Sequence, residues 1–150
     1  MISKKSKYGL KALMFLARRS DQGPVLIADL ARQEQLPRKF LELILLELKN
    51  SGILQSRKGK GGGYLLAKRP EQISVGEVLR VLDGSLALLP CVEQRGSDNC
   101  DEADICGLRA VMQDVQQEID RILDHTSLTG LVDRTESLIR SKNQNLEYSI

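Results

Sequence analysis

Aromatic side chains and histidine are scarce in this chain of 150 residues. Aromatic residues make up 3% of the sequence, Trp is absent, and His125 is the only histidine. A core with so few rings must be built from aliphatic side chains, and the plentiful Leu and Ile favour packed helices. One histidine, with carboxylates that show no pairing beyond helical surface spacing, gives no catalytic set, so the composition argues against an enzyme.

Long hydrophobic runs are also lacking. The longest apolar run near the start extends only from Ala12 to Ala17, whereas a transmembrane helix needs about 20 apolar residues. The opening residues Met-Ile-Ser-Lys-Lys do not resemble a secretory signal. We therefore expect no membrane span and a cytoplasmic protein.

Acidic residues are few in the first half of the chain, although the formal net charge is only +2. Residues 1–69 contain 15 Lys or Arg and 5 Asp or Glu, while residues 70–150 contain 7 basic and 15 acidic residues. A strongly basic half suits a polyanion, because each phosphate that it neutralises releases condensed counterions. The alternative is a solvated surface of uneven charge.

Hydrophobic spacing predicts three helices in the basic half. The first covers residues 3–19 with Ser3 as its N-cap. The third runs from about Pro37, as its first helical residue, to Lys49, and Gly52 supplies the left-handed residue that ends it. The short helix between them is expected to bury Leu26, Ile27, Leu30 and Ala31.

Two short apolar segments follow, at residues 53–55 and 64–67, joined by a basic, glycine-rich stretch over residues 57–63. This pattern predicts a β-hairpin with a long tip. Helix, short helix, turn, longer helix and hairpin in this order predict a winged helix-turn-helix. The expected fold class is therefore mainly α with a small β-hairpin wing.

The acidic half contains further helices around one irregular segment. Ser74 opens a helix that ends near Leu82, with capping-box spacing to Glu77. Residues 84–104 show no periodicity, which indicates a loop, and Ser127 is a suitable cap for a last helix. We expect the chain to divide into a winged-helix domain at 1–83, a cysteine-containing loop at 84–106, and a long helix with a C-terminal helix at 107–150.

The long helix expected after the cysteine-containing loop carries an apolar heptad seam. Such a seam is typical of a helix that packs lengthwise on another helix. We expect it to form a homodimer. Packing of the seam on the N-terminal domain of the same chain is the alternative. The seam consists of Leu108, Met112, Val115, Ile119 and Ile122.

The predicted third helix is the expected DNA-reading helix, because the first exposed turn of such a helix enters the major groove. Arg38 can donate to guanine, Glu42 can accept from cytosine, and Lys39 can contact a base or a phosphate. Phe40 can touch a thymine methyl group, with a place in the core as the alternative. Lys4, Lys5 and Lys7 could add contacts to the DNA backbone.

The hairpin tip supplies a second candidate contact. Its glycines let the backbone come close to phosphates, and a cation there can enter a narrow minor groove. The tract lacks the Gly-Lys-Ser/Thr ending of a nucleotide-binding loop. The DNA-binding candidates of the tip are Arg57, Lys58, Lys60, Gly61 and Gly62.

All three cysteines, Cys91, Cys100 and Cys106, fall within 16 residues of one segment. In a reducing compartment this odd-numbered cluster favours metal ligation or thiol chemistry over disulfides. The spacing is wider than that of ordinary zinc sites and suits an iron–sulfur cluster. Of the two common types we expect 2Fe-2S in preference to 4Fe-4S. Zinc, redox thiols and purely structural cysteines are the alternatives. The fourth ligand is open, with weak candidates in His125, Asp101, Glu102, Asp104 or a residue of a partner subunit.

These residues closely resemble the Rrf-type winged-helix transcriptional regulators, the family that includes IscR, NsrR and CymR. The resemblance covers nearly the whole chain and rests on residues 2–17, Pro37 to Glu42 and the wing segment Gly61-Gly62-Gly63-Tyr64-Leu65-Leu66. It implies a homodimer, a long dimer helix, major-groove roles for the start of the third helix, Lys58 as the minor-groove cation, and the three cysteines as cluster ligands. Arg109 stands where some members carry a histidine ligand, so the fourth ligand is not transferred.

The leading hypothesis is a homodimeric regulator of a double-stranded DNA operator that senses iron, redox state or nitric oxide through the cluster. The alternative keeps the winged helix but gives the cysteines a structural zinc or redox thiols, with regulation through a protein partner docked on the acidic half.

Overall fold

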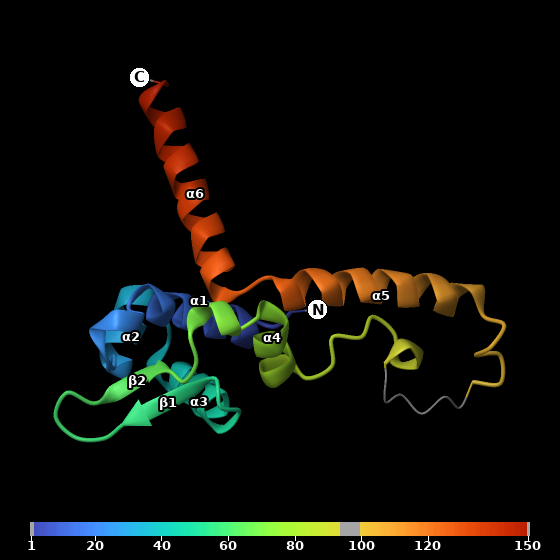
Figure 1. Ribbon diagram of the computed structural model, residues 1–150, viewed down its shortest axis with the longest axis horizontal. Helices are drawn as coiled ribbons and strands as arrows, with labels where there is room; N and C mark the ends of the chain where they lie inside the picture. Colours follow the sequence, from blue (N-terminus) through green and yellow to red (C-terminus); the bar gives the residue numbers. More distant parts are fainter. Residues whose placement is uncertain (1, 94–99, 150) are drawn as a thin grey trace.

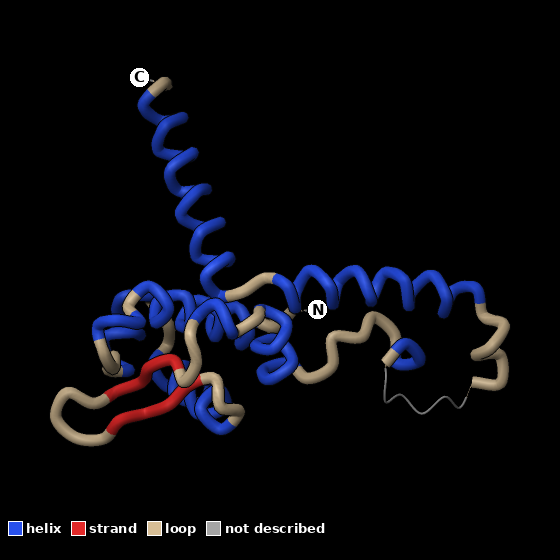
Figure 2. Tube along the Cα trace, in the orientation of Figure 1, coloured by secondary structure: helices blue, strands red, loops and turns tan. Residues whose placement is uncertain are grey.

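The computed structural model describes residues 2–93 and 100–149, which are mainly helical with one two-stranded antiparallel sheet (Figures 1 and 2). This architecture confirms the predicted fold class. Three short 3₁₀ turns, η1 (Ser20–Gln22), η2 (Pro70–Gln72) and η3 (Pro90–Val92), lie in the connections. The longer elements are α1 (Lys4–Arg18), α2 (Ile27–Glu34), α3 (Arg38–Asn50), β1 (Leu54–Arg57), β2 (Gly63–Leu66), α4 (Val75–Asp83), α5 (Gly107–His125) and α6 (Leu128–Glu147).

Serine caps begin three of the helices, as the sequence predicts. The Ser3, Ser74 and Ser127 hydroxyls accept hydrogen bonds from the amides three residues further on, at 3.0 to 3.1 Å. Each satisfies one of the amide groups that a helix leaves without an internal partner at its N-terminus.

Two predicted details are wrong at the starts of α2 and α3. Leu26 is 55% exposed, because it is the extended N-cap residue of α2 rather than part of its buried side. The neighbouring Val25 is buried instead. Pro37 is likewise the N-cap residue of α3, with ψ at 118°, and not its first helical residue.

The hairpin pairs β1 with β2 from Leu54 opposite Leu66 to Arg57 opposite Gly63. The start of β2 is joined to the segment before α2, because Val25 and Tyr64 exchange two backbone hydrogen bonds of 2.8 Å. Gly63 has φ at 144° and a backbone approach to Val25 that leaves no room for a Cβ atom. The wing is therefore held to the helical domain by backbone pairing that requires glycine.

The core is aliphatic and includes the first turn of α6. Leu128 is fully buried among residues of α1, α3 and α4. Its amide donates to the Ile73 carbonyl at 2.9 Å, and the Val75 amide donates to the Thr126 carbonyl at 2.8 Å. These bonds fix the junction of α5 and α6 to the start of α4, and α6 packs on α1 before it extends away (Figure 1).

The α1 N-terminus carries three lysines and no acidic residue in its first turn, a charge pattern that the helix dipole disfavours. The compensating carboxylate comes from Asp83 at the end of α4. It accepts hydrogen bonds from the Ser3 amide at 3.0 Å and from the Ser3 hydroxyl. Burial acts to raise the pKa of Asp83, but the hydrogen bonds from Ser3 and the charge of Lys5 outweigh it and hold the pKa below its ordinary value.

We expect Asp83→Ala to lower the free energy of unfolding by about 1 kcal/mol at pH 7, the usual effect of losing a cap. Because the folded-state pKa is lowered, this contribution is complete above the ordinary Asp pKa of about 4 and disappears as the pH falls through the folded-state value. Urea unfolding at a series of acidic pH values measures it. Asp114→Ala, which removes an exposed carboxylate from α5, is the control. A loss that is the same at every pH would contradict the charged cap.

Within the described residues, no helix is both long enough and apolar enough to cross a lipid bilayer.

Candidate nucleic-acid interface and cysteine loop

The exposed side of α3 presents charged side chains at its start. Arg38, Lys39 and Glu42 are all exposed, and the Arg38 Nε lies 3.2 Å from the Glu42 Oε1. This pair spans one helical turn, so each side chain limits the orientations of the other. In the view of Figure 1, α3 and the hairpin lie on the side of the molecule away from α6.

Two other predicted DNA-binding residues contact a side chain of another helix. The Phe40 ring is half-buried and meets Tyr8 edge to face, with ring centroids 5.7 Å apart. The Lys5 Nζ lies 2.8 Å from a Glu47 carboxylate oxygen. Both contacts join α1 to α3, so the structure gives Phe40 and Lys5 a part in orienting the two helices. Lys4 is exposed at the start of α1.

The wing exposes its three cations. Arg57 ends β1, and Lys58 and Lys60 lie in the turn that follows. Gly61 is exposed with φ at 75°. Gly62 is buried, its amide donates to the Gly59 carbonyl at 3.0 Å, and backbone atoms leave no space for a Cβ atom there. Gly62 therefore shapes the turn, while Gly61 and the cations are presented to solvent.

The three cysteines are free thiols in the loop between α4 and α5, and Cys106 is the last residue of this loop. Cys91 lies in η3 and Cys106 is the N-cap of α5, and both are half-buried, while Cys100 is exposed. Arg109 connects Cys91 to Cys106. Its Nε donates a hydrogen bond to the Cys91 carbonyl at 3.1 Å, and its amide donates one to the Cys106 Sγ at 3.4 Å.

The described ranges 2–93 and 100–149 contain no group of three Cys, His, Asp or Glu side chains already close enough to hold a metal ion. The structure thus brings Cys91 and Cys106 to one region through Arg109 but does not assemble the three thiols into a site. His125 is at the opposite end of α5 from Cys106, about 28 Å away at the usual helical rise. Its Nδ1 lies 2.7 Å from the Arg121 carbonyl.

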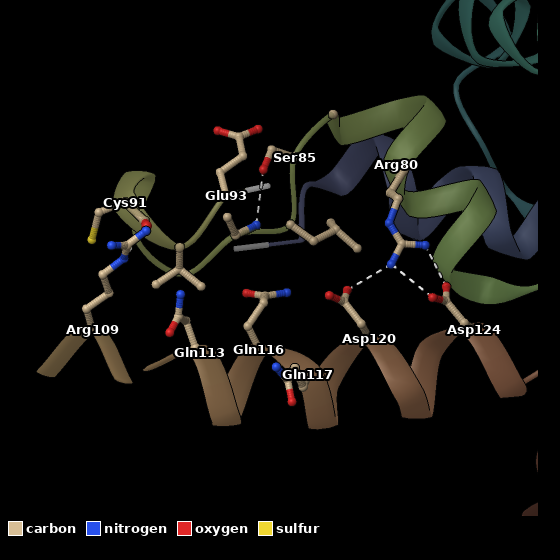
Figure 3. Close-up of a pocket in the computed structure, with 14 residues that line it drawn as sticks. Arg80, Ser85, Cys91, Glu93, Arg109, Gln113, Gln116, Gln117, Asp120 and Asp124 are labelled. Atoms are coloured by element: carbon tan, nitrogen blue, oxygen red, sulfur yellow. Dashed lines mark hydrogen bonds and ion pairs between the residues drawn. The ribbon is translucent and has the colours of Figure 1, made fainter. Parts of the chain in front are cut away.

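An open cleft of about 890 Å³ separates α5 from α4 and the loop that carries Cys91 (Figure 3). Sequence reasoning missed its main contact, in which Arg80 of α4 binds two carboxylates of α5. The Arg80 guanidinium lies 2.5 Å from Asp124 and 2.8 Å from Asp120. The hydrogen bond to Asp124 is the largest influence and raises the pKa of Arg80, although burial acts in the opposite direction. The only local signal was the spacing of the two aspartates, which places both on one helix face.

Further along the cleft, the side chain of Gln116 is buried and its Oε1 accepts a hydrogen bond from the Leu88 amide at 3.0 Å. The loop before Cys91 is thereby attached to the middle of α5, while Arg80 attaches the helix end to α4.

Comparison with known proteins agrees with this arrangement. A family model described as "Rrf2: Iron-dependent Transcriptional regulator" matches residues 2–134. The chain belongs to the Rrf2 family of transcriptional regulators. It is 36% identical to an rrf2-like HTH-type transcriptional regulator of Rhodobacter capsulatus, over 88% of this chain and 92% of that protein.

Two solved structures share the fold of this Rrf2-family protein. The structure of CymR, the global cysteine regulator of B. subtilis, has a TM-score of 0.74 with 28% identity, over 89% of this chain and 97% of that chain. IscR of T. potens has a TM-score of 0.73 with 30% identity, over 92% and 90% of the two chains. The R. capsulatus protein and CymR are named as regulators, which agrees with the prediction that the chain is not an enzyme.

Proposed function

We propose that this Rrf2-family regulator binds a double-stranded operator as a homodimer and responds to iron, redox state or nitric oxide through a cluster held by Cys91, Cys100 and Cys106. The observation that carries the proposal is the place of the cysteines. All three precede α5, Cys106 as its N-cap, and the other end of this helix is attached to the winged helix by Arg80. In functional terms we divide the chain into a DNA-binding domain (1–83), a cluster loop (84–106) and a dimerisation and C-terminal region (107–150).

DNA contact is supported by two exposed basic elements. Arg38, Lys39 and Glu42 form the first exposed turn of α3, and such a turn faces base edges when the helix enters the major groove. The wing carries Lys58 and Lys60 on an exposed turn, which suits contact with phosphates or the minor groove.

Dimerisation is supported by the exposed seam of α5. Leu108, Val115 and Ile122 are 64%, 41% and 52% exposed, which is unusual for aliphatic side chains that recur on one face of a helix. Among the described residues, α5 packs on the winged-helix domain through α4, where Arg80 binds Asp120 and Asp124 near the C-terminal end of α5. A second copy of the helix would cover these side chains, and two-fold symmetry would match a palindromic operator.

The donor set suits an iron–sulfur cluster. Three free thiols offer soft ligands, and such clusters are held by cysteine thiolates, with another residue type completing the set in some centres. Cys91, Cys100 and Cys106 would hold the cluster, which would supply a change of charge and of loop structure when it is oxidised, damaged or lost. We favour 2Fe-2S over 4Fe-4S. The family description, which names iron, supports iron over zinc.

Coupling between loop and DNA is assigned to α5. Gln116 and Arg109 attach it to the cysteine loop, and Asp120 and Asp124 attach it to Arg80 of α4. The two states would be the loop with its cluster and the loop without it. They would differ in DNA affinity only if α3 and α4 take different positions in each.

Anaerobic purification tests the cluster. We expect a coloured protein with visible absorbance and matching amounts of iron and sulfide, whose affinity for an operator selected from random duplexes changes when the cluster is removed. A colourless protein with stoichiometric zinc would contradict the proposal and favour the structural-zinc alternative.

Alanine substitutions in α3 and in the wing are expected to weaken DNA binding in different ways. Arg38→Ala should weaken binding to the selected operator by about 1 to 3 kcal/mol and relax the preference at one base pair, because it removes a base contact. Lys60→Ala should weaken all duplexes alike and reduce the slope of log affinity against log salt concentration by about 1, because it removes a phosphate contact. Fluorescence anisotropy with operator and random duplexes at several salt concentrations separates the two. Equal losses on both duplexes for Arg38→Ala would count against base reading.

A further inference from the structure

Two leucines on the outer face of α3 have no place in the core. Leu43 is 59% exposed and Leu46 is 48% exposed. The core side of the same helix is already formed by other aliphatic residues, which are at most 1% exposed: Leu41, Ile44, Leu45 and Leu48. Leu43 and Leu46 are thus exposed apolar residues on the helix that is expected to enter DNA.

The charged side chains one turn from them are two lysines and two glutamates, and both glutamates are already paired with cations of α1 and α3. With about 100° between successive helical residues, Leu46 lies near the middle of the exposed face and Leu43 at one side of it. Lys39 is one turn before Leu43, and Lys49 is three residues after Leu46. An apolar strip between exposed lysines is complementary to an anionic partner that also offers apolar groups, and a purely apolar protein or lipid surface would leave those lysines without partners.

The major groove of DNA is such a partner. It is lined by phosphates, and the 5-methyl group of thymine is its apolar base-edge feature. Leu43 lies about 7.5 Å along the helix axis from Arg38 and Leu46 about 12 Å, so the exposed side of α3 that begins at Arg38 continues to both leucines within little more than two turns.

We propose that Leu43 and Leu46 contact thymine methyl groups and so specify A·T pairs beside the positions read by Arg38 and Glu42. This inference rests on the proposed function and adds a class of base to its recognition.

Deoxyuridine scanning tests the proposal, because deoxyuridine pairs as thymine does but lacks the 5-methyl group. A duplex is first selected from a random pool by the full-length protein, and each thymine is then replaced singly. For the wild-type protein we expect about a fourfold loss of affinity at one or two thymines, the equivalent of one methyl group buried. Leu43→Ala should bind the thymine and deoxyuridine duplexes equally at one of these positions, and Leu46→Ala should do so at another.

Two control variants show whether the deoxyuridine effect depends on apolar side chains at these positions of α3. Leu138→Ala truncates a leucine that is 71% exposed on α6, so it should retain the full deoxyuridine effect. Leu43→Met should also retain it, because an apolar side chain of similar length remains. If the selected duplex shows no deoxyuridine effect, or if Leu43→Ala and Leu46→Ala leave the effect intact, the inference is overturned. Failure to select any preferred duplex would instead overturn the proposed operator binding.

Discussion

Val115→Glu will make the protein monomeric and weaken operator binding about 100-fold or more. Val115 is in the middle of the exposed seam of α5 and is 41% exposed in the single chain. A carboxylate there would have to be buried without a partner when two copies of α5 pack together, which costs more than the valine contact contributed. A monomer also loses the avidity of two linked half-site contacts, which is typically a factor of 100 or more.

Gln117→Glu is the matched control, because it adds the same charge to an exposed position on the opposite side of α5. Analytical ultracentrifugation gives the oligomeric state, and fluorescence anisotropy with a palindromic operator gives the affinity. The seam has another role if Val115→Glu sediments as a dimer and binds with wild-type affinity.

The parts of the fold that could be predicted are those set by neighbours in the sequence. Ser3, Ser74 and Ser127 cap helices because their hydroxyls reach amides only three residues away. The heptad seam and the glycine-rich turn are local in the same sense. The errors at Leu26 and Pro37 are of one residue at helix starts, where extended and helical backbone compete closely.

The contacts that could not be predicted join residues far apart in the chain. Asp83 caps α1 from 80 residues away, and Arg80 reaches Asp120 and Asp124 across 40 and 44 residues. Nothing in the local pattern identifies the partner of an acidic residue at the end of a helix. The docking of Leu128 into the winged-helix core depends on the backbone bonds at Ile73 and Val75, which periodicity does not reveal.

For the candidate DNA-binding residues, exposure could be predicted from the sequence but contacts with other helices could not. Exposure of Arg38, Lys39 and Glu42 follows from their place opposite the apolar face of α3. The same periodicity places Leu43 and Leu46 outside the core positions, so the exposure of both leucines was also predictable from the sequence. For Phe40 and Lys5, the partners Tyr8 and Glu47 belong to another helix, so their contacts within the protein required the three-dimensional arrangement.

Clustering in the sequence identified the cysteines but not their different surroundings. Cys106 is held at the start of a helix, Cys91 in a short turn, and Cys100 is exposed. Under the proposed function Cys106 holds the cluster and also caps α5, and these two roles can be separated by experiment.

Cys106→Ser and Cys106→Ala will both lose their iron, but they will differ in stability. Removal of one of three thiolate ligands should reduce iron and visible absorbance to background in both anaerobically purified variants. The Cys106 Sγ also accepts a hydrogen bond from the Arg109 amide, and a serine hydroxyl is a better N-cap than a thiol, whereas alanine cannot cap at all. We therefore expect the free energy of unfolding of Cys106→Ala to be about 1 kcal/mol lower than that of Cys106→Ser. Urea titration of the iron-free proteins measures both values.

Ser127→Ala is the matched control, because it removes the cap of α6 and leaves the three thiols in place. It should lose stability and keep its iron. Full iron content in Cys106→Ser would show that Cys106 is not a ligand. Equal stability of the serine and alanine variants would show that the thiol does not hold the start of α5.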